Sequence, residues 1–447
     1  MIRTLSNHLD SLLKKLGVEN ISGIIKGSTV MMLAKYLAVF LGFISSMVIN
    51  WHYGTSTLGL IATFASLLQI LVIFSVLGNQ TLLVKLLPVY VENKQKTAAL
   101  QLIKKITLLT AITALIVLTL FHTLRIFFDI RLLEQTKGYH VLISVLLVVT
   151  AYSRITKFIL RGLGDFKLFS LLETVPAFIT LPIVFLSIAV GLHEYEFMHA
   201  HYLASLITLI LGIYLFKTQS KKILRQASEI TKPEALSAII LTSIPMFGTS
   251  LGSIVINNSD ILILSHFHDK ETVGIYSIYA KLAGVMMVLI TGINAMFATR
   301  VSGLYSQGKI EEMRKVVKNT TLYSFTISAC IATVLLIFSG PFLSLYGPDF
   351  NEHKSAMYVL IFATLINAFF GSTGIFMNMT NQHQRFFIIM GFAALVNIFL
   401  NILLVPTYGM MGAALTTLAT IIIWNSISSY FIYRKFGYVL FTVKLHR

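Results

Sequence analysis

Charged residues are scarce in this chain. Asp, Glu, Lys and Arg make up 12% of its 447 residues, while hydrophobic residues make up 56%. Soluble domains are about a quarter charged, and one soluble core of this size could not bury so much apolar surface. The composition therefore excludes an ordinary soluble domain and favours an integral membrane protein.

Cysteine is nearly absent from the sequence, and a nucleotide-binding loop is wholly absent. Cys330 is the only cysteine, which excludes an internal disulfide and thiolate metal sites. It lies in an apolar run, and we expect it to pack in the core. The sequence has no phosphate-binding G-x-x-x-x-G-K-[ST] loop and no H-E-x-x-H motif. We therefore expect no ATP site, no cofactor and no metal.

Long apolar runs are abundant. A helix that crosses the hydrocarbon core needs about 20 such residues, and the runs predict an all-α membrane protein of about twelve spans. The first 27 residues carry apolar side chains at helical spacing between lysines, which predicts an interfacial amphipathic helix. The predicted spans are 28–49, 58–84, 104–124, 139–160, 168–190, 197–216, 237–264, 273–299, 317–338, 355–378, 386–405 and 410–433.

The basic residues are distributed unevenly between the two sides of these spans. Of the 35 Lys and Arg residues, 28 fall in the N-terminus, in alternate loops and in the tail 434–447, five fall in the opposite loops, and Lys35 and Lys281 lie inside spans. By the positive-inside rule, both termini are cytoplasmic. The net charge of +17 is thus explained by an anionic phospholipid membrane, and we expect no nucleic-acid partner.

The chain also resembles itself at a shift of 215 residues. Seven identities occur in 38 aligned positions, among them Gly59 with Gly274 and Asn79 with Asn294. The matched segments have the same orientation, which predicts two parallel six-helix bundles around a central cavity. The predicted lobes are 28–216 and 237–433, joined by a cytoplasmic linker at 217–236.

Four short motifs occur in order along the chain. They are Arg161-Gly-Leu-Gly-Asp-Phe166, Asp260-Ile-Leu-Ile-Leu with Val273-Gly-Ile-Tyr-Ser277 and Ala280-Lys-Leu282, Leu345-Tyr-Gly-Pro-Asp-Phe350, and Pro406-x-Tyr-Gly-x-x-Gly-Ala-Ala414. Together they resemble the polysaccharide flippases of the multidrug/oligosaccharidyl-lipid/polysaccharide exporter superfamily.

The resemblance implies a function. It implies a bacterial inner-membrane flippase that moves undecaprenyl-pyrophosphate-linked oligosaccharides from the cytoplasmic to the periplasmic leaflet, for O-antigen or other surface polysaccharide. A polysaccharide polymerase is a candidate partner. Two alternatives stay open: a cation-coupled multidrug exporter and a membrane enzyme such as a polymerase. The sequence does not choose between an ion gradient, the membrane potential and product removal as the energy source.

Cations at membrane depth are the candidate site, because a charge there is costly and usually faces a cavity or a partner. Lys35 and Lys281 are such residues. Arg154, Lys157 and Arg161 follow a spacing of three and four, which places them on one helix face. We interpret these five as a cationic cavity and entry path for a lipid pyrophosphate or for acidic sugars.

Each candidate cation has a plainer explanation. Lys35 could reach the near surface, and Arg154, Lys157 and Arg161 could anchor the chain to anionic lipid. Glu173 is expected to pair with the basic face, and Asp260 is a possible structural partner of Lys281. Asn79 and Asn294 are candidates for a polar path or for ordinary interhelical hydrogen bonds.

Overall fold

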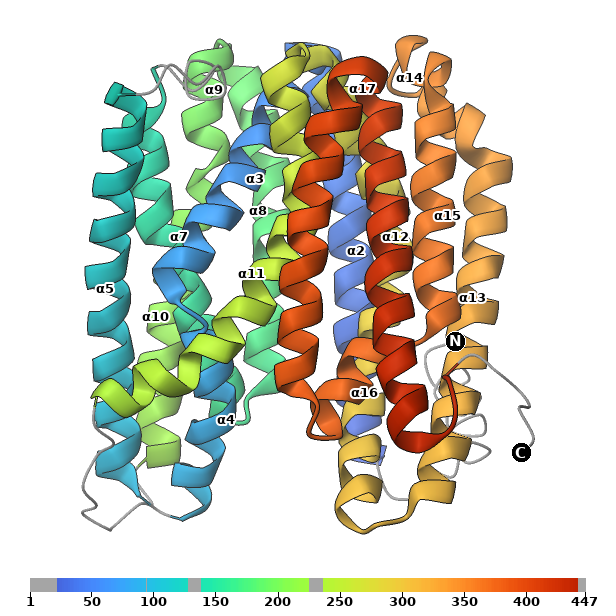
Figure 1. The fold of residues 1–447 in the computed structure, drawn as a ribbon. Coiled ribbons are helices and arrows are strands. Elements are labelled where there is room, and N and C mark those ends of the chain that lie inside the picture. Colours follow the sequence, from blue (N-terminus) through green and yellow to red (C-terminus); the bar gives the residue numbers. More distant parts are fainter. Residues whose placement is uncertain (1–21, 94, 128–137, 225–235, 441–447) are drawn as a thin grey trace.

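The computed structural model describes residues 22–93, 95–127, 138–224 and 236–440, and in these ranges it contains helices only (Figure 1). The predicted amphipathic helix, most of the linker and the end of the tail therefore lie largely outside the described residues. The helices are α2 (Ser22–Tyr53), α3 (Thr55–Val76), α4 (Asn79–Glu92), α5 (Lys96–Phe127), α7 (His140–Gly162), α8 (Phe166–Val190), α9 (Glu194–His201), α10 (Leu203–Leu224), α11 (Leu236–Phe267), α12 (Lys270–Ser306), α13 (Ile310–Ser344), α14 (Asp349–Glu352), α15 (Lys354–Phe370), α16 (Thr373–Met379) and α17 (His383–Phe436).

Eleven helices in the described ranges are long and apolar enough to cross a membrane. The longest, α17, has 54 residues and is interrupted at Gly409, where φ is 53°. It therefore holds both of the last two predicted spans. With α17 counted twice, the prediction of about twelve spans is confirmed.

Polar side chains and glycines set the helix ends at the membrane surfaces. The carboxylate of Asp165 accepts a hydrogen bond from Leu168 N at the start of α8, and Asp269 accepts one from Thr272 N at the start of α12. Such caps satisfy backbone donors that the helix leaves free. Gly191 ends α8 in the left-handed region with φ of 74°, a conformation that glycine adopts without steric cost.

In the described part of the chain, the repeat extends beyond the two segments matched by sequence. The N-terminal lobe holds α2 to α10 and the C-terminal lobe α11 to α17 (Figure 1). Helices α3, α7 and α8 begin at residues 55, 140 and 166, and α12, α15 and α17 begin at 270, 354 and 383, at intervals of 215, 214 and 217. The shift found in one pair of segments therefore relates both lobes.

The two lobes meet closely at the end that holds α9 and α14, which the charge count predicts to be outside and which we call the outer end (Figure 1). On the α2 side, Asn50 Nδ2 donates to the carbonyl of Tyr346 at 2.6 Å and Trp51 Nε1 donates to that of Leu345 at 2.7 Å. The hydroxyls of Ser46 and Tyr346 lie 2.9 Å apart. The outer end is thus closed by bonds between α2 and the turn after α13.

Two repeat-related glycines allow α3 and α12 to cross in contact at the same end. A Cβ on Gly59 would lie 1.9 Å from the carbonyl oxygen of Lys270, and a Cβ on Gly274 would lie 2.3 Å from that of Thr55. No side chain fits at such distances. The identity of Gly59 and Gly274 in the repeat is therefore explained by a steric requirement on both helices.

The structure differs from the sequence-based prediction at several points. The predicted span 58–84 is broken into α3 and α4 at Leu77 and Gly78, both of which have positive φ. The first part of α11 leaves its own lobe and packs against this break, with Phe74 and Phe247 rings 5.6 Å apart (Figure 1). Cys330, expected in the core, is exposed on α13.

The crossing of α3 and α12 gives a testable prediction. Gly274→Ala should destabilise the folded protein by about 1–3 kcal/mol, because overpacking forces the helices apart. Thermal unfolding of the purified protein in detergent measures the effect. Gly284→Ala on the same helix is the control, since its Cβ would have no neighbour within 4 Å. Equal unfolding temperatures for the two variants would contradict the account.

Candidate functional site

The basic face of α7 is formed as the spacing predicts, and each of its cations has a different partner. Arg154 Nη2 donates a hydrogen bond to Gln69 Oε1 on α3 at 2.5 Å. Lys157 Nζ forms an ion pair of 2.6 Å with Glu173 Oε1 on α8. The Arg161 guanidinium lies over the rings of Phe158 and Phe169, 5.8 and 5.2 Å from their centroids. Only Lys157 is therefore neutralised by a direct contact.

Glu173 is the electrostatic centre of this cluster. Its carboxylate interacts with Lys157 by charge and hydrogen bond, and by charge with Lys35 on α2 and with Arg154. Arg161 is also within electrostatic range of Glu173. The structure thus brings together four of the five predicted cations around the predicted carboxylate, and the cluster as a whole keeps an excess of positive charge.

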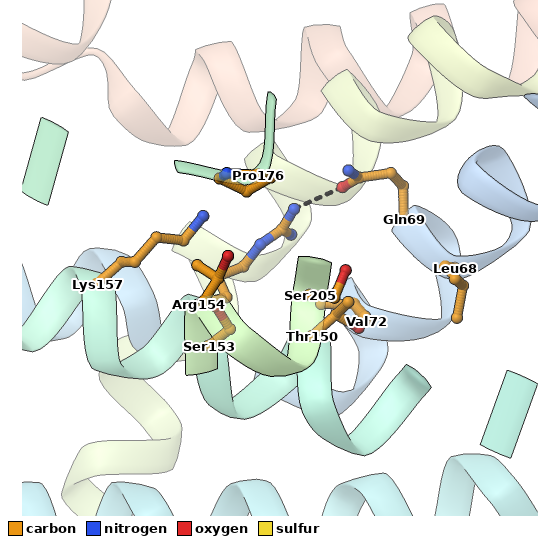
Figure 2. Close-up of a pocket in the computed structure, with 10 residues that line it drawn as sticks. Leu68, Gln69, Val72, Thr150, Ser153, Arg154, Lys157, Pro176 and Ser205 are labelled. Carbon is orange, nitrogen blue, oxygen red and sulfur yellow. Dashed lines mark hydrogen bonds between the residues drawn. The ribbon is translucent and has the colours of Figure 1, made fainter. Parts of the chain in front are cut away.

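A cavity of about 140 Å³ lies beside Arg154 and Lys157. Figure 2 shows Arg154 reaching toward Gln69, with Lys157 on its other side and Pro176 of α8 close by. The hydroxyls that line it were not predicted from the sequence, because isolated Ser and Thr residues in apolar runs carry no distinctive pattern. The lining residues are Leu68, Gln69, Val72, Thr150, Ser153, Arg154, Lys157, Pro176, Ser205 and Thr208.

The size and polarity of the cavity define what it can hold. Its volume of about 140 Å³ is below the roughly 300–1,000 Å³ of sites that enclose drug-sized ligands. Cationic, amide and hydroxyl groups converge in it. The arrangement can therefore bind a small anionic group by charge-assisted hydrogen bonds.

The suggested ion pair between Asp260 and Lys281 is wrong. Asp260 is buried and accepts a hydrogen bond of 2.6 Å from the hydroxyl of Tyr276. Lys281 remains accessible; its Nζ lies 3.4 Å from the carbonyl oxygen of Gly42 and 5.7 Å from the Phe43 ring centroid. The two side chains leave α11 and α12 in different directions, so Asp260 joins the C-terminal lobe and Lys281 faces α2.

The two repeat-related asparagines have different surroundings. Asn79 is fully buried at the break between α3 and α4, and neither end of its amide has a hydrogen-bond partner. Asn294 accepts a hydrogen bond from the Ser372 hydroxyl. Neither residue lines the cavity.

Asparagines of the C-terminal lobe form a polar network between helices. Asn397 accepts a hydrogen bond from Asn401 at 3.2 Å and donates one to Thr420 at 3.1 Å, and it also accepts from Ser259. The residues recur at helical spacing, yet the spacing alone does not say that they face one another.

Among the residues that the structure describes, no group of three His, Cys, Asp or Glu side chains could hold a metal ion.

Comparisons with known sequences identify the family. Residues 24–302, well over half of the chain, match the family described as "Polysaccharide biosynthesis protein", and residues 245–403 match the MatE family. The capsular polysaccharide biosynthesis protein CapF of Staphylococcus aureus is 28% identical over 204 residues, 44% of this chain and 50% of CapF. The probable flippase AglR of Haloferax volcanii is 23% identical over 266 residues, 58% of this chain and 53% of AglR. The chain thus spans about half the length of these relatives.

Solved structures share the fold. An inward-facing multidrug transporter of the MATE family superposes with a TM-score of 0.70 at 14% identity, covering 90% of this chain and 94% of that one. The lipid II flippase MurJ, in an inward closed conformation, superposes with a TM-score of 0.68 at 14% identity, covering 90% and 87%.

The two related lobes have the fold that the MATE-family transporter and the lipid II flippase MurJ share. By sequence, the chain belongs to the polysaccharide biosynthesis protein family. The fold class and the family resemblance found in the sequence are both confirmed.

The separate surroundings of Asp260 and Lys281 give a second prediction. Asp260→Ala should destabilise the protein by about 1–3 kcal/mol, because it leaves the buried Tyr276 hydroxyl without its acceptor. Lys281→Ala should leave stability within about 0.5 kcal/mol, as for substitutions away from buried networks. The unfolding temperatures of the two variants test this. A similar fall in both would indicate that Asp260 and Lys281 form an ion pair after all.

Proposed function

We propose that the protein is a flippase for undecaprenyl-pyrophosphate-linked oligosaccharide repeat units. It would carry them from the cytoplasmic to the periplasmic leaflet of the bacterial inner membrane by alternating access, for O-antigen or other surface polysaccharide. The observation that carries the proposal is the cavity beside Arg154 and Lys157, which offers two cations to a small anionic group at membrane depth.

The dimensions of the site support a lipid-linked substrate. A cavity of about 140 Å³ accommodates the charged joint between lipid and sugar but not an oligosaccharide. The sugars would lie between the lobes and the lipid chain in the bilayer. Only the charged joint is common to such substrates, so one site could serve repeat units of different composition.

The closed outer end supports entry from the opposite side. The bonds of Asn50 and Trp51 to the turn after α13 join the lobes at the end predicted to be periplasmic. The basic face of α7 leads from its last turn, at Arg161, inward to Arg154. In this orientation both termini are cytoplasmic, and positive charge increases the local concentration of anionic lipid headgroups at the entrance.

A cation-coupled multidrug exporter is the second candidate. The match of residues 245–403 to the MatE family and the buried carboxylate of Asp260 favour it. The charge of the N-terminal site favours the flippase, because an organic cation would be repelled by the cluster around Arg154.

Deleting the gene tests the proposed function. Lipid-linked repeat units should accumulate on the cytoplasmic leaflet, and surface polysaccharide should fall, because the substrate no longer crosses. Leaflet-specific labelling of the sugars measures this. If the units cross normally and sensitivity to cationic drugs rises, the protein is an exporter.

Point substitutions test the site within that function. Lys35→Ala and Arg154→Ala should each lower surface polysaccharide at least about tenfold at unchanged protein level, which corresponds to about 1.4 kcal/mol of lost binding or transition-state stabilisation. Lys309→Ala is the control, since its side chain is half exposed and lies away from the site, 3.9 Å from the Glu312 carboxylate. Full polysaccharide in both variants would remove these residues from the site.

A further inference from the structure

We propose that Glu173 acts as a counter-ion to Lys157 when no substrate is bound. Its presence makes the site selective for a doubly charged pyrophosphate over a singly charged phosphodiester. This inference rests on the proposed function, which supplies the pyrophosphate. It adds that a residue of the protein competes with the substrate for the same cation.

The environment of Glu173 supports this competition. Of the carboxylates in the described part of the chain, Glu173 alone acts electrostatically on both Arg154 and Arg161. Its one hydrogen-bond partner is Lys157, and the two side chains keep 32% and 19% of their surface accessible. Both side chains are partly accessible, so an incoming anion can reach Lys157 and replace the carboxylate there without leaving the lysine unpaired.

Lys157 and Arg154 differ in the charge of the group that each one contacts. Gln69 gives Arg154 an acceptor but no negative charge, so the charge of Arg154 stays available to an incoming anion. Lys157, which lines the same cavity, is available only after Glu173 leaves it. A substrate must therefore supply enough negative charge to satisfy both cations and displace the carboxylate.

The chemistry of lipid headgroups makes this a useful filter. A membrane phospholipid presents a phosphodiester with one negative charge, whereas a pyrophosphate diester carries two. A single charge can be satisfied at Arg154 and gains little from displacing Glu173. A double charge interacts with both cations, and Coulomb attraction at a site with reduced dielectric strengthens with each added charge. Glu173 would thus keep abundant phospholipid out.

The repeat shows that this device belongs to one lobe. At the intervals that relate α7 to α15, Arg154 falls on 368–369 and Lys157 on 371–372; at those that relate α8 to α17, Glu173 falls on 388–390. None of the residues at these positions is charged. The helix packing common to both lobes therefore does not require the Lys157–Glu173 pair, which favours a role in binding.

Two synthetic probes that differ by one phosphate test the proposal. Full-length protein in nanodiscs of neutral lipid is titrated with farnesyl-pyrophosphoryl-N-acetylglucosamine and with farnesyl-phosphoryl-N-acetylglucosamine. The wild type should prefer the pyrophosphoryl probe. Glu173→Gln should bind the phosphoryl probe about tenfold more tightly, so that discrimination falls. Glu312→Gln, which removes the carboxylate of an exposed Lys–Glu pair elsewhere, should change neither affinity.

A double substitution provides a second readout, should Glu173→Gln alone fail to fold. Lys157→Gln leaves Glu173 without its partner and facing the ligand, so it should weaken pyrophosphoryl binding strongly. Adding Glu173→Gln to Lys157→Gln should recover part of that loss, about threefold or more, because the remaining repulsion is removed.

The outcomes separate this inference from the proposed function. If neither the wild type nor any variant binds the pyrophosphoryl probe, the flippase proposal fails and the counter-ion role fails with it. If the wild type binds it but Glu173→Gln leaves the preference unchanged, or the double substitution recovers nothing, only the counter-ion role is overturned.

Discussion

The cost of placing charge inside a hydrocarbon layer is the constraint on which this structure depends. Several basic side chains lie within helices that cross the membrane, and each must find water, an acceptor or a counter-charge. Arg154 finds an amide, Lys157 a carboxylate, Arg161 two aromatic faces and Lys281 a carbonyl group. These partners differ in charge, and the difference indicates which cations remain available for a ligand. Two of the cations, Arg154 and Lys157, line the cavity of the N-terminal lobe.

The repeat supplies the frame and its asymmetry supplies the site. Both lobes have the same helices at intervals near 215 residues, and the two glycines at equivalent positions let them meet at the outer end. The N-terminal lobe carries the cations around Glu173. The C-terminal lobe instead carries Asp260 and a network of amides and hydroxyls around Asn397, which join α11, α12 and α17. One lobe is thus suited to hold an anion, and the other is held together by neutral polar contacts and a buried carboxylate.

The spans, the repeat and the basic face of α7 could be predicted because they follow from length, composition and helical spacing. The pairing of Lys157 with Glu173 could be predicted in part, since both lie within the adjoining ends of consecutive helices. The relation of Asp260 to Lys281 could not, because it depends on how α11 and α12 rotate about their axes. The break at Leu77 and Gly78 is stabilised by contact with α11, which comes from far along the chain. The role of Gln69 is likewise set by tertiary contact, and a lone glutamine in an apolar run gives no signal.

The most direct measurement is a cryo-electron microscopy structure of the full-length protein in a nanodisc with farnesyl-pyrophosphoryl-N-acetylglucosamine bound. The account predicts density for the two phosphates beside α7, within hydrogen-bonding distance of Arg154 and Lys157, with Glu173 turned away from Lys157. Phosphate density bound elsewhere between the lobes, with the Lys157–Glu173 pair intact, would contradict it.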